Sequence, residues 1–426
     1  MSKKSLWYPY AQMQGMKVEN VVTGAEGVKL HFSDGTSVID AVSSWWCVIH
    51  GYNHPELNNA LQNQAEQFSH VMLGGLTHAP AQKLAQKLVE ITPEGLNHVF
   101  FADSGSVGME VATKMAVQYW HNKGVAGKQR FIALYRGYHG DTTGVMSLGD
   151  PEEGMHSLFK GFLREQIFVN PPTTWDGLSD PVTDEVAKLD LERAIRDLEE
   201  ALQKHGHEVA AMVCEPLLQG AGGMKLYPPE YLRAARKLCD KYQVLLIIDE
   251  VATGFGRTGT FSAVDRVGIS PDIAVYAKGL TAGYLGLSAT MASTEVFEAF
   301  LGEDSDRAFM HGPTFMGNAL ACSVALKGIE IFARDDYLTK ISTIESILRR
   351  ELQGFKHEQV EEVRVLGAMA AIQVKDPKIF AGMQEFAAQN GVWLRPFVDV
   401  VYTMPPYIIS EKDLVKICDT MKAWFK

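Results

Sequence analysis

Short, uninterrupted apolar runs alternate with amphipathic helical patterns through most of this chain. Strands that are buried on both faces have continuous apolar sequences, and they occur in parallel sheets whose faces are covered by helices. The sequence therefore predicts an α/β fold with a mostly parallel sheet. The predicted strands are Val99–Ala102, Phe131–Tyr135, Val209–Cys214, Val244–Ile248 and Pro271–Tyr276.

The helical patterns lie before and between these strands. Leu84, Leu88 and Ile91 share one face of a helix that Pro93 ends. The charge-rich segment Asp184–Lys204 is expected to be a surface excursion of the large domain. Further helices are predicted over Val107–Trp120, Leu191–Leu202 and Tyr231–Tyr242.

Both ends of the chain have a different pattern. Val28–Phe32 and Ser37–Ala41 flank a polar Asp-Gly turn and predict a β-hairpin. After about residue 334, two long helical patterns accompany the isolated strands Val363–Leu366 and Ala368–Val374. We predict a large domain over residues 44–333 and a smaller α+β domain built from residues 1–43 and 334–426.

The composition excludes several classes of protein. The 426 residues include 40 Lys and Arg and 51 Asp and Glu, so the net charge is −11. The chain also has no basic tract, and this charge pattern argues against nucleic acid or an anionic membrane as a partner. The longest aliphatic run, Val244–Ile248, is far shorter than the ~20 residues of a membrane span. No apolar stretch supports a signal peptide in Met1–Tyr10. Five scattered cysteines without CxxC spacing indicate reduced thiols in a cytoplasmic protein, with no disulfide framework or metal site.

Polar groups of complementary type follow three of the predicted strands. Ser104-Gly105-Ser106 follows the first strand at the start of a helix, where free N–H groups attract a phosphate. Asp249 and Glu250 follow Val244–Ile248, and Lys278 follows Pro271–Tyr276. Ligands of open α/β sheets bind beyond the carboxyl ends of the strands, so we expect these groups to share one site.

Together these groups match the needs of pyridoxal 5′-phosphate (PLP). That cofactor requires an anion site for its phosphate, a carboxylate that keeps its pyridine nitrogen protonated, and a lysine that holds its aldehyde as a Schiff base. Each motif alone has an ordinary structural explanation, such as an N-cap serine or a solvated lysine. The combination favours a PLP site.

A longer motif identifies a family. The segment from Leu246-Ile247-Ile248-Asp249-Glu250-Val251 through Gly254-Phe255-Gly256-Arg257-Thr258-Gly259 to Lys278-Gly279 resembles the signature of the class III, fold type I PLP-dependent aminotransferases. The resemblance extends along the whole chain. It implies a large domain with a mostly parallel seven-stranded sheet flanked by helices, and a homodimer with active sites at the subunit interface.

Within this class, the chain resembles the members that act in biotin biosynthesis. The resemblance implies ping-pong transfer of the amino group of S-adenosylmethionine to 8-amino-7-oxononanoate, giving 7,8-diaminononanoate. The motifs that carry it are Trp7-Tyr8-Pro9-Tyr10, Ser43-Ser44-Trp45-Trp46, His50–Pro55, His70-Val71-Met72, Ala102–Val107, Gly137–Asp141, Met310–Asn318, Arg395-Pro396-Phe397 and Tyr402–Tyr407.

The resemblance assigns roles around the cofactor. Lys278 resembles the Schiff-base lysine, which also moves the proton during catalysis, and Asp249 matches the carboxylate that faces the pyridine nitrogen. Gly105 and Ser106 match the phosphate-binding turn. The remaining cofactor residues are Tyr138, an aromatic lid on the ring, Val251 on its other face, and Pro313 and Thr314, which reach the phosphate from the neighbouring subunit.

Other residues match the substrate site of these relatives. Trp45 resembles the tryptophan that lines the pocket, and Tyr10 the tyrosine that closes it and assists catalysis. Arg395 matches the arginine that holds a substrate carboxylate, which a planar guanidinium binds through two hydrogen bonds. Tyr402 supports that arginine, Gly312 contributes a backbone contact, and Tyr138 and Lys278 also contact substrate.

Alternatives remain open. Ala221 stands where ornithine- and 4-aminobutyrate-type relatives carry a glutamate that pairs with the active-site arginine, which disfavours those activities. A second interpretation is that the protein is an ω-amino acid or diamine aminotransferase. Lysine is an alternative amino donor for the same step of biotin biosynthesis. A nucleotide-binding oxidoreductase built on Gly220-Ala221-Gly222-Gly223 is a third, although this run lacks the full dinucleotide fingerprint.

Overall fold

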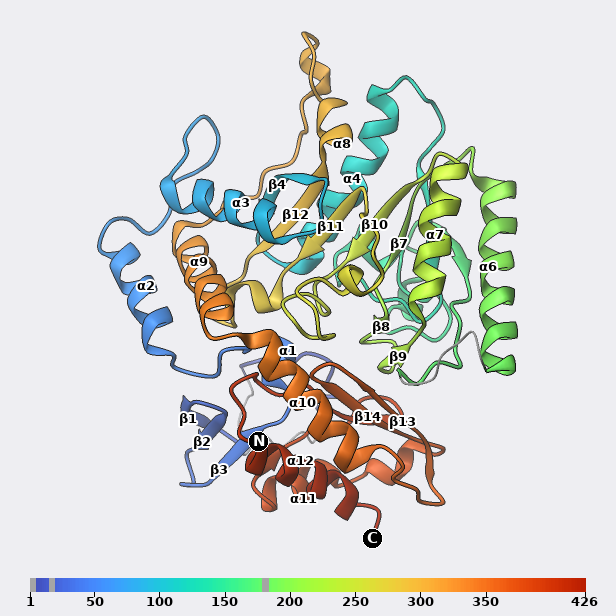
Figure 1. Ribbon diagram of the computed structural model, residues 1–426. Coiled ribbons are helices and arrows are strands. Elements are labelled where there is room, and N and C mark those ends of the chain that lie inside the picture. The colour runs from blue at the N-terminus through green and yellow to red at the C-terminus, as the bar shows by residue number, and fades with distance from the viewer. Residues whose placement is uncertain (1–4, 15–19, 178–183) are drawn as a thin grey trace.

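The centre of the fold is a seven-stranded sheet with the strand order β4-β12-β11-β10-β7-β5-β6. A computed structural model describes residues 5–14, 20–177 and 184–426 (Figure 1). Only β12 runs antiparallel to its neighbours, so the predicted mostly parallel seven-stranded sheet is confirmed. The strands are β4 (Leu96–Ala102), β5 (Arg130–Leu134), β6 (Ile167–Val169), β7 (Val209–Cys214), β10 (Leu245–Asp249), β11 (Ile273–Tyr276) and β12 (Ser288–Ser293).

Helices cover both faces of this sheet. Alternate residues of a strand point to opposite faces. In β10, Leu246 and Ile248 pack in the same apolar cluster as α6 (Glu185–His205) and α7 (Pro229–Lys241), whereas Leu245 and Ile247 pack with α4 (Gly105–Asn122). Figure 1 shows α6 and α7 side by side at one edge of the molecule.

The segment Asp184–Lys204 differs from its prediction. It is not an excursion but most of α6, and Leu191, Leu198 and Leu202 on its inner face are buried. The charged residues of this segment lie on the outer face of an amphipathic helix. The high charge of the segment therefore gave no indication that its other face is buried in the core.

Two smaller sheets are built from the ends of the chain. The first contains β1 (Val22–Glu26), β2 (Lys29–Phe32), β3 (Ser37–Asp40) and β15 (Val392–Trp393), so the predicted hairpin is paired with a C-terminal strand. The second contains β13 (Val360–Leu366), β14 (Met369–Val374) and β16 (Val400–Thr403). The strands expected to be isolated therefore form a hairpin. The domain boundaries at 43/44 and 333/334 stay a prediction.

The remaining elements connect or cover these sheets (Figure 1). The helices are α1 (Ser43–Trp46), α2 (Pro55–Ala65), α3 (Ala79–Ile91), α5 (Thr143–Met146), α8 (Thr294–Glu298), α9 (Ala319–Arg334), α10 (Tyr337–Leu352), α11 (Met383–Gln389) and α12 (Glu411–Ala423). A two-stranded hairpin joins β8 (Leu218–Gln219) and β9 (Lys225–Leu226). Short 3₁₀ turns cover Ser157–Phe159, Ala263–Arg266, Lys278–Thr281, Ser305–Arg307 and Pro377–Phe380.

The register of the sheet brings the predicted site residues to one edge. Asp249 is paired with Val275, three residues before Lys278, and Ile248 is paired with Cys214, which precedes Glu215. Because the three strands are parallel, their carboxyl ends present these polar residues side by side.

None of the described helices is both long and apolar enough to cross a membrane. Across the same ranges of the chain, no group of three or more His, Cys, Asp and Glu side chains could hold a metal ion.

Burial of α6 generates a prediction about stability. Leu198→Ala removes a fully buried side chain and should lower the free energy of unfolding by about 2–5 kcal/mol. Leu189→Ala is the matched control because Leu189 lies on the same helix and is 59% exposed. Urea unfolding measures both. Equal effects of the two substitutions would contradict the packing of α6 against the sheet.

Candidate active site

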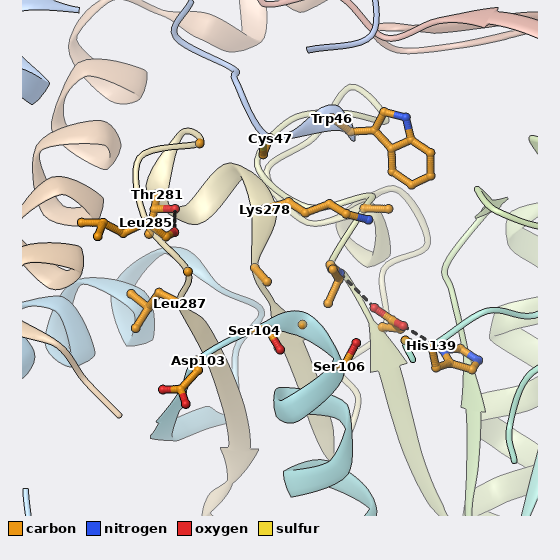
Figure 2. A pocket seen from close by; sticks show the side chains of 18 of the residues that line it. Trp46, Cys47, Asp103, Ser104, Ser106, His139, Lys278, Thr281, Leu285 and Leu287 are labelled. Carbon is orange, nitrogen blue, oxygen red and sulfur yellow. Dashed lines mark hydrogen bonds and ion pairs between the residues drawn. The ribbon is translucent and has the colours of Figure 1, made fainter. Parts of the chain in front are cut away.

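A cavity of about 420 Å³ lies at the carboxyl edge of the large sheet. Its walls come from the turns after β4, β10 and β11, and from the segment that carries α1. Figure 2 shows Lys278 and Trp46 at one side of this cavity, and Ser104 and Ser106 at the start of α4 on the other. The residues that the sequence placed at three strand ends therefore share one site.

The amine of Lys278 lies against an aromatic ring. Its Nζ lies 4.2 Å from the centroid of the Trp46 ring, and among the described residues it has no hydrogen bond or ion pair. Burial lowers the pKa of Lys278, against the opposing charges of Asp249 and Glu215. An amine with a lowered pKa is more readily available as a nucleophile or base near neutral pH.

Asp249 is held by two hydrogen bonds. Its Oδ2 lies 2.7 Å from His139 Nδ1, and its Oδ1 accepts the N–H of Val251 at 3.0 Å (Figure 2). Burial by itself lowers the pKa of His139, but Asp249 and then Glu215 outweigh this effect, so the pKa of His139 is raised. His139 thus gives the buried carboxylate of Asp249 a hydrogen-bonding partner at the end of an otherwise apolar strand.

Glu215 forms a second buried carboxylate behind this pair. It accepts the N–H groups of Tyr138 at 3.2 Å and Gly220 at 3.0 Å. Burial raises the pKa of Glu215 to about 7. Glu215 thus connects the turn after β7 with the loop that contains Tyr138.

The start of α4 has the form of an anion site. Ser104 caps the helix by accepting the N–H of Val107 at 3.3 Å, while the amides of the first turn have no intrahelical acceptors. A Cβ at Gly105 would lie 2.7 Å from Val251 Cγ1, so this position needs glycine. The Ser106 hydroxyl accepts the N–H of Asp141 at 3.1 Å and keeps its proton for a ligand.

These residues fit PLP. The helix start suits its phosphate, the Asp249 carboxyl group suits a protonated ring nitrogen, and the unpartnered amine of Lys278 suits its aldehyde. Tyr138 and Val251 line the same cavity. This cavity contains every cofactor residue predicted from the sequence except Pro313 and Thr314.

A second cavity of about 340 Å³ adjoins the first and shares Trp46, Tyr138 and Lys278 with it. Trp45, Tyr10, Arg395 and Tyr402 all line it, as the sequence predicted. We call it the substrate cavity.

Arg395 lies on the wall of the substrate cavity. Its guanidinium carbon is 5.1 Å from the centroid of the Trp45 ring, which gives a cation–π contact. No ion pair or hydrogen bond to Arg395 is present within the described parts of the chain. Tyr402 is buried beside it and accepts the indole N–H of Trp46 at 3.3 Å. The guanidinium is therefore available to a carboxylate.

A strained turn places the two tryptophans. All four residues of α1, Ser43, Ser44, Trp45 and Trp46, have positive φ angles of 49°, 46°, 60° and 74°, so α1 is a left-handed turn. The buried carboxylate of Asp40 stabilises it by accepting the N–H groups of Val42 at 2.9 Å and Ser44 at 2.8 Å. Left-handed backbone is costly for residues with a side chain, and it often marks a functional site.

Asp141 connects the N-terminal segment to the cofactor cavity. Its carboxylate accepts hydrogen bonds from the hydroxyl groups of Tyr10 at 2.7 Å and Tyr138 at 3.0 Å, and it lies 2.9 Å from His156 Nε2. The Tyr10 ring also meets Trp45 edge-on, with centroids 6.1 Å apart. Tyr10 is thus fixed at the wall of the substrate cavity, and its closing role stays a prediction.

Sequence reasoning assigned no role to His139, Asp141 or Trp46. All three lie within motifs that carried the family resemblance, close to Tyr138 or Trp45 in the sequence. That proximity was the available indication that they have a role in the site. His139 and Asp141 contact residues more than 100 positions away in the chain, and a local sequence pattern cannot show such contacts.

Gly312, Pro313 and Thr314 line neither cavity of their own chain. They lie in a loop before α9, where the carbonyl of Thr314 lies 2.7 Å from His70 Nε2. The assignment of Pro313 and Thr314 to the neighbouring subunit, and of Gly312 to a substrate contact, stays a prediction.

Comparison with known proteins places the chain in a family. Residues 10–425 match the family model described as Aminotransferase class-III. The adenosylmethionine-8-amino-7-oxononanoate aminotransferase of Mycobacterium leprae is 43% identical over 98% of this chain and 94% of the relative. The enzyme of the same name from Buchnera aphidicola subsp. Baizongia pistaciae is 42% identical over 98% of this chain and 95% of the relative.

Solved structures agree. The adenosylmethionine-8-amino-7-oxononanoate aminotransferase of Methanocaldococcus jannaschii superposes with a TM-score of 0.91 and 34% identity, covering 99% of this chain and 96% of that one. An amine transaminase from an uncultivated Pseudomonas species, in its PLP-bound form, has a TM-score of 0.90 and 28% identity, covering 100% of this chain and 99% of that one. With its lysine, carboxylate and helix start in one cavity, the chain belongs to the class III aminotransferases.

Proposed function

We propose that this protein is a PLP-dependent aminotransferase of biotin biosynthesis. It moves the amino group of S-adenosylmethionine to 8-amino-7-oxononanoate and forms 7,8-diaminononanoate in a ping-pong reaction. The observation that carries this proposal is the unpartnered Arg395 guanidinium, which shares one cavity with Lys278 and the aromatic side chains of Trp45 and Tyr10. Relatives of about 40% identity that carry this enzyme's name support the same substrates.

The cofactor supplies an electron sink for the carbon that gains or loses the amino group. The chain's own residues prepare the site for it. The helix start at Gly105 and Ser106 would bind the phosphate, and the Asp249 carboxylate would face the ring nitrogen and favour its protonated state. Val251 and Tyr138, which line the same cavity, would contact its ring.

Lys278 moves the proton. Its Nζ is free of hydrogen bonds within the described chain, and burial lowers its pKa, which favours the neutral amine that accepts a proton. The hydroxyl groups of Tyr10 and Tyr138 both bind Asp141, and these contacts fix one wall of the substrate cavity that Lys278 also lines.

Arg395 recognises the acceptor. Its guanidinium binds the terminal carboxylate of 8-amino-7-oxononanoate, and Trp45 packs along the aliphatic chain. Ala221 lines the same cavity and has no carboxylate that could compete for Arg395. The arginine therefore stays available throughout the reaction.

The enzyme acts as a homodimer in the cytoplasm. Exposed apolar side chains gather on two loops that meet at the contact between His70 and Thr314, namely Met72 and Leu76 on one loop and Met310 and Phe315 on the other. Exposed apolar patches of this kind mark protein interfaces. Pairing of two chains through these loops would bring Gly312, Pro313 and Thr314 to the neighbouring active site.

Two other readings have specific support. The amine transaminase neighbours share the fold at 27–29% identity, which keeps an amine or ω-amino acid substrate as a second candidate. Lysine is an alternative amino donor for the same pathway step. A screen of donors against 8-amino-7-oxononanoate separates these readings.

The first prediction concerns Lys278. Lys278→Ala should remain folded but lose transaminase turnover, because no other described amine lines the cofactor cavity. Borohydride reduction of the wild type should fix the cofactor to Lys278, as measured by mass spectrometry of a digest. Lys87→Ala is the control, since Lys87 pairs with Glu90 on the surface of α3, away from the cavity. Label on any other lysine would refute the assignment.

The second prediction separates His139 from Asp249. Asp249→Asn should weaken cofactor binding and slow turnover by orders of magnitude, because the ring nitrogen loses its anionic partner. His139→Leu should leave Asp249 a buried carboxylate without its cation, and cofactor affinity should fall as well. His139→Asn should restore part of that affinity by donating to Asp249. Fluorescence titration of the apoenzyme with PLP measures all three variants. Wild-type affinity in His139→Leu would show that Asp249 does not depend on this contact.

The third prediction concerns Arg395. Arg395→Ala should cost about 2–5 kcal/mol in kcat/KM for 8-amino-7-oxononanoate, as expected for loss of one partner of a buried charged pair. Arg395→Lys should recover only part of this loss because an ammonium cannot form the two-pronged contact. The visible spectrum of the holoenzyme is the control and should not change. Unaltered acceptor kinetics would place the carboxylate elsewhere.

A further inference from the structure

Glu215 is a buried carboxylate that the proposed chemistry does not use. It follows β7 directly, and β7 is paired with β10, which ends in Asp249. Glu215 is only 4% exposed, and it borders the cofactor cavity. Burial of a charge is costly, so the contacts of this carboxylate need a physical explanation.

One oxygen of Glu215 holds the cofactor side of the site. Its Oε2 accepts the N–H of Tyr138, with 3.2 Å between the two atoms. Tyr138 lines the cofactor cavity, and the next residue, His139, is the partner of Asp249. The same short loop thus contains the side chain proposed to contact the cofactor ring and the partner of the ring's carboxylate. Glu215 fixes this loop by its backbone.

The other oxygen of Glu215 holds the substrate side. Its Oε1 accepts the N–H of Gly220, which follows β8, at 3.0 Å. A Cβ at Gly220 would lie 3.0 Å from Cη2 of Trp46, so this turn packs closely against the Trp46 ring. Trp46 lines both cavities, and its ring faces Lys278 Nζ. Glu215 therefore supports a wall that the cofactor and substrate cavities share.

Both contacts are suited to the ionised carboxylate. An ionised carboxylate offers two acceptor oxygens, whereas protonation turns one of them into a donor. The backbone N–H that faces the protonated oxygen of Glu215 then loses its acceptor in a buried place, which is costly. Protonation of Glu215 therefore loosens the loop of Tyr138 or the turn at Gly220.

We propose that Glu215 is a positioning residue that, in its ionised form, holds Tyr138 against the cofactor ring and the Gly220 turn against Trp46. It acts through the backbone of these two segments and not through a contact of its own with the substrates. This inference rests on one part of the proposed function, the contact of Tyr138 with the ring. It does not depend on the identity of the amino donor or acceptor.

The surroundings of Glu215 determine the pH at which this positioning is lost. The titratable groups that face it are those of His139, Asp249, Lys278, Cys214 and Tyr227. Burial raises the pKa of Glu215 to about 7, while the charge of His139 opposes this rise and that of Asp249 adds to it. Burial also raises the pKa values of Cys214 and Tyr227, so both stay neutral near pH 7. The contribution of Glu215 to cofactor affinity should therefore disappear as the pH falls through about 7.

The test is a fluorescence titration of the full-length apoenzyme with PLP on either side of this pKa, at about pH 5.5 and about pH 8.5. In Glu215→Gln, the Kd for PLP should rise about tenfold at the higher pH, as expected for loss of a buried hydrogen bond to a charged group. At the lower pH the Kd should match that of the wild type, because Glu215 is then protonated. Comparison of variant and wild type at each pH cancels the titration of the cofactor itself.

Glu110→Gln is the matched control. Glu110 also accepts two backbone N–H groups, from Gly144 at 2.7 Å and Val145 at 3.3 Å, but it lines neither cavity. This variant should keep the wild-type affinity for PLP at both pH values.

Two further variants separate positioning from charge alone. Glu215→Asp keeps the negative charge but shortens the side chain, so it should lose the same affinity at about pH 8.5. It also keeps the inference testable if Glu215→Gln does not fold. In Tyr138→Ala the ring that Glu215 positions is absent, so the added substitution Glu215→Gln should raise the Kd by no more than about twofold.

An equal loss of affinity at both pH values would overturn the role of the ionised form. Wild-type affinity in Glu215→Asp would show that charge alone suffices and would overturn the positioning role. Unchanged PLP affinity in Tyr138→Ala would refute the ring contact and the inference together. No substrate enters these measurements, so a failure of the proposed substrates is distinguished from a failure of this inference.

Discussion

A carboxylate at the end of a buried strand needs a partner, and the site depends on how this chain provides one for Asp249. An unpaired charge in such a place would be neutralised or would destabilise the fold. His139 reaches Asp249 from the loop after β5, and Glu215 supports the positive charge of His139 from the end of β7. Three neighbouring strands of one sheet thus fix the charge that the cofactor ring requires. Because the Asp249 carboxylate is already paired with His139, it forms no ion pair with Lys278, and the Lys278 amine stays free.

Part of this arrangement could be predicted because it follows from local sequence. Asp249 and Lys278 follow apolar runs that only a buried sheet explains, and a parallel sheet places such residues at one edge. Ser104 and Gly105 follow another strand and begin a helix, which predicts the anion site. In each case the chemistry depends on a strand end and needs no knowledge of distant contacts.

The remainder depends on tertiary structure. No propensity predicts four consecutive left-handed residues at Ser43–Trp46, and the hydroxyl of Ser43 there donates to the carbonyl of Met404, which is 361 residues away. The contacts of Asp141 join the N-terminal segment to a loop 131 residues away. The charges of α6 concealed its buried face in the same way. Gly312 and Thr314 line neither cavity of their own chain, and their roles stay a prediction of the proposed dimer.

The left-handed turn at Ser43–Trp46 also limits how this protein can be improved. Each residue held there forgoes about 1–2 kcal/mol relative to a relaxed backbone, so the native sequence lies below the greatest stability that its fold allows. A selection for heat resistance would favour glycine at Trp45, which is 44% exposed and where glycine relieves the strain. That gain would remove an aromatic wall from the substrate cavity. Robustness and selectivity are therefore opposed at this one turn, and a designer would have to seek stability elsewhere in the molecule.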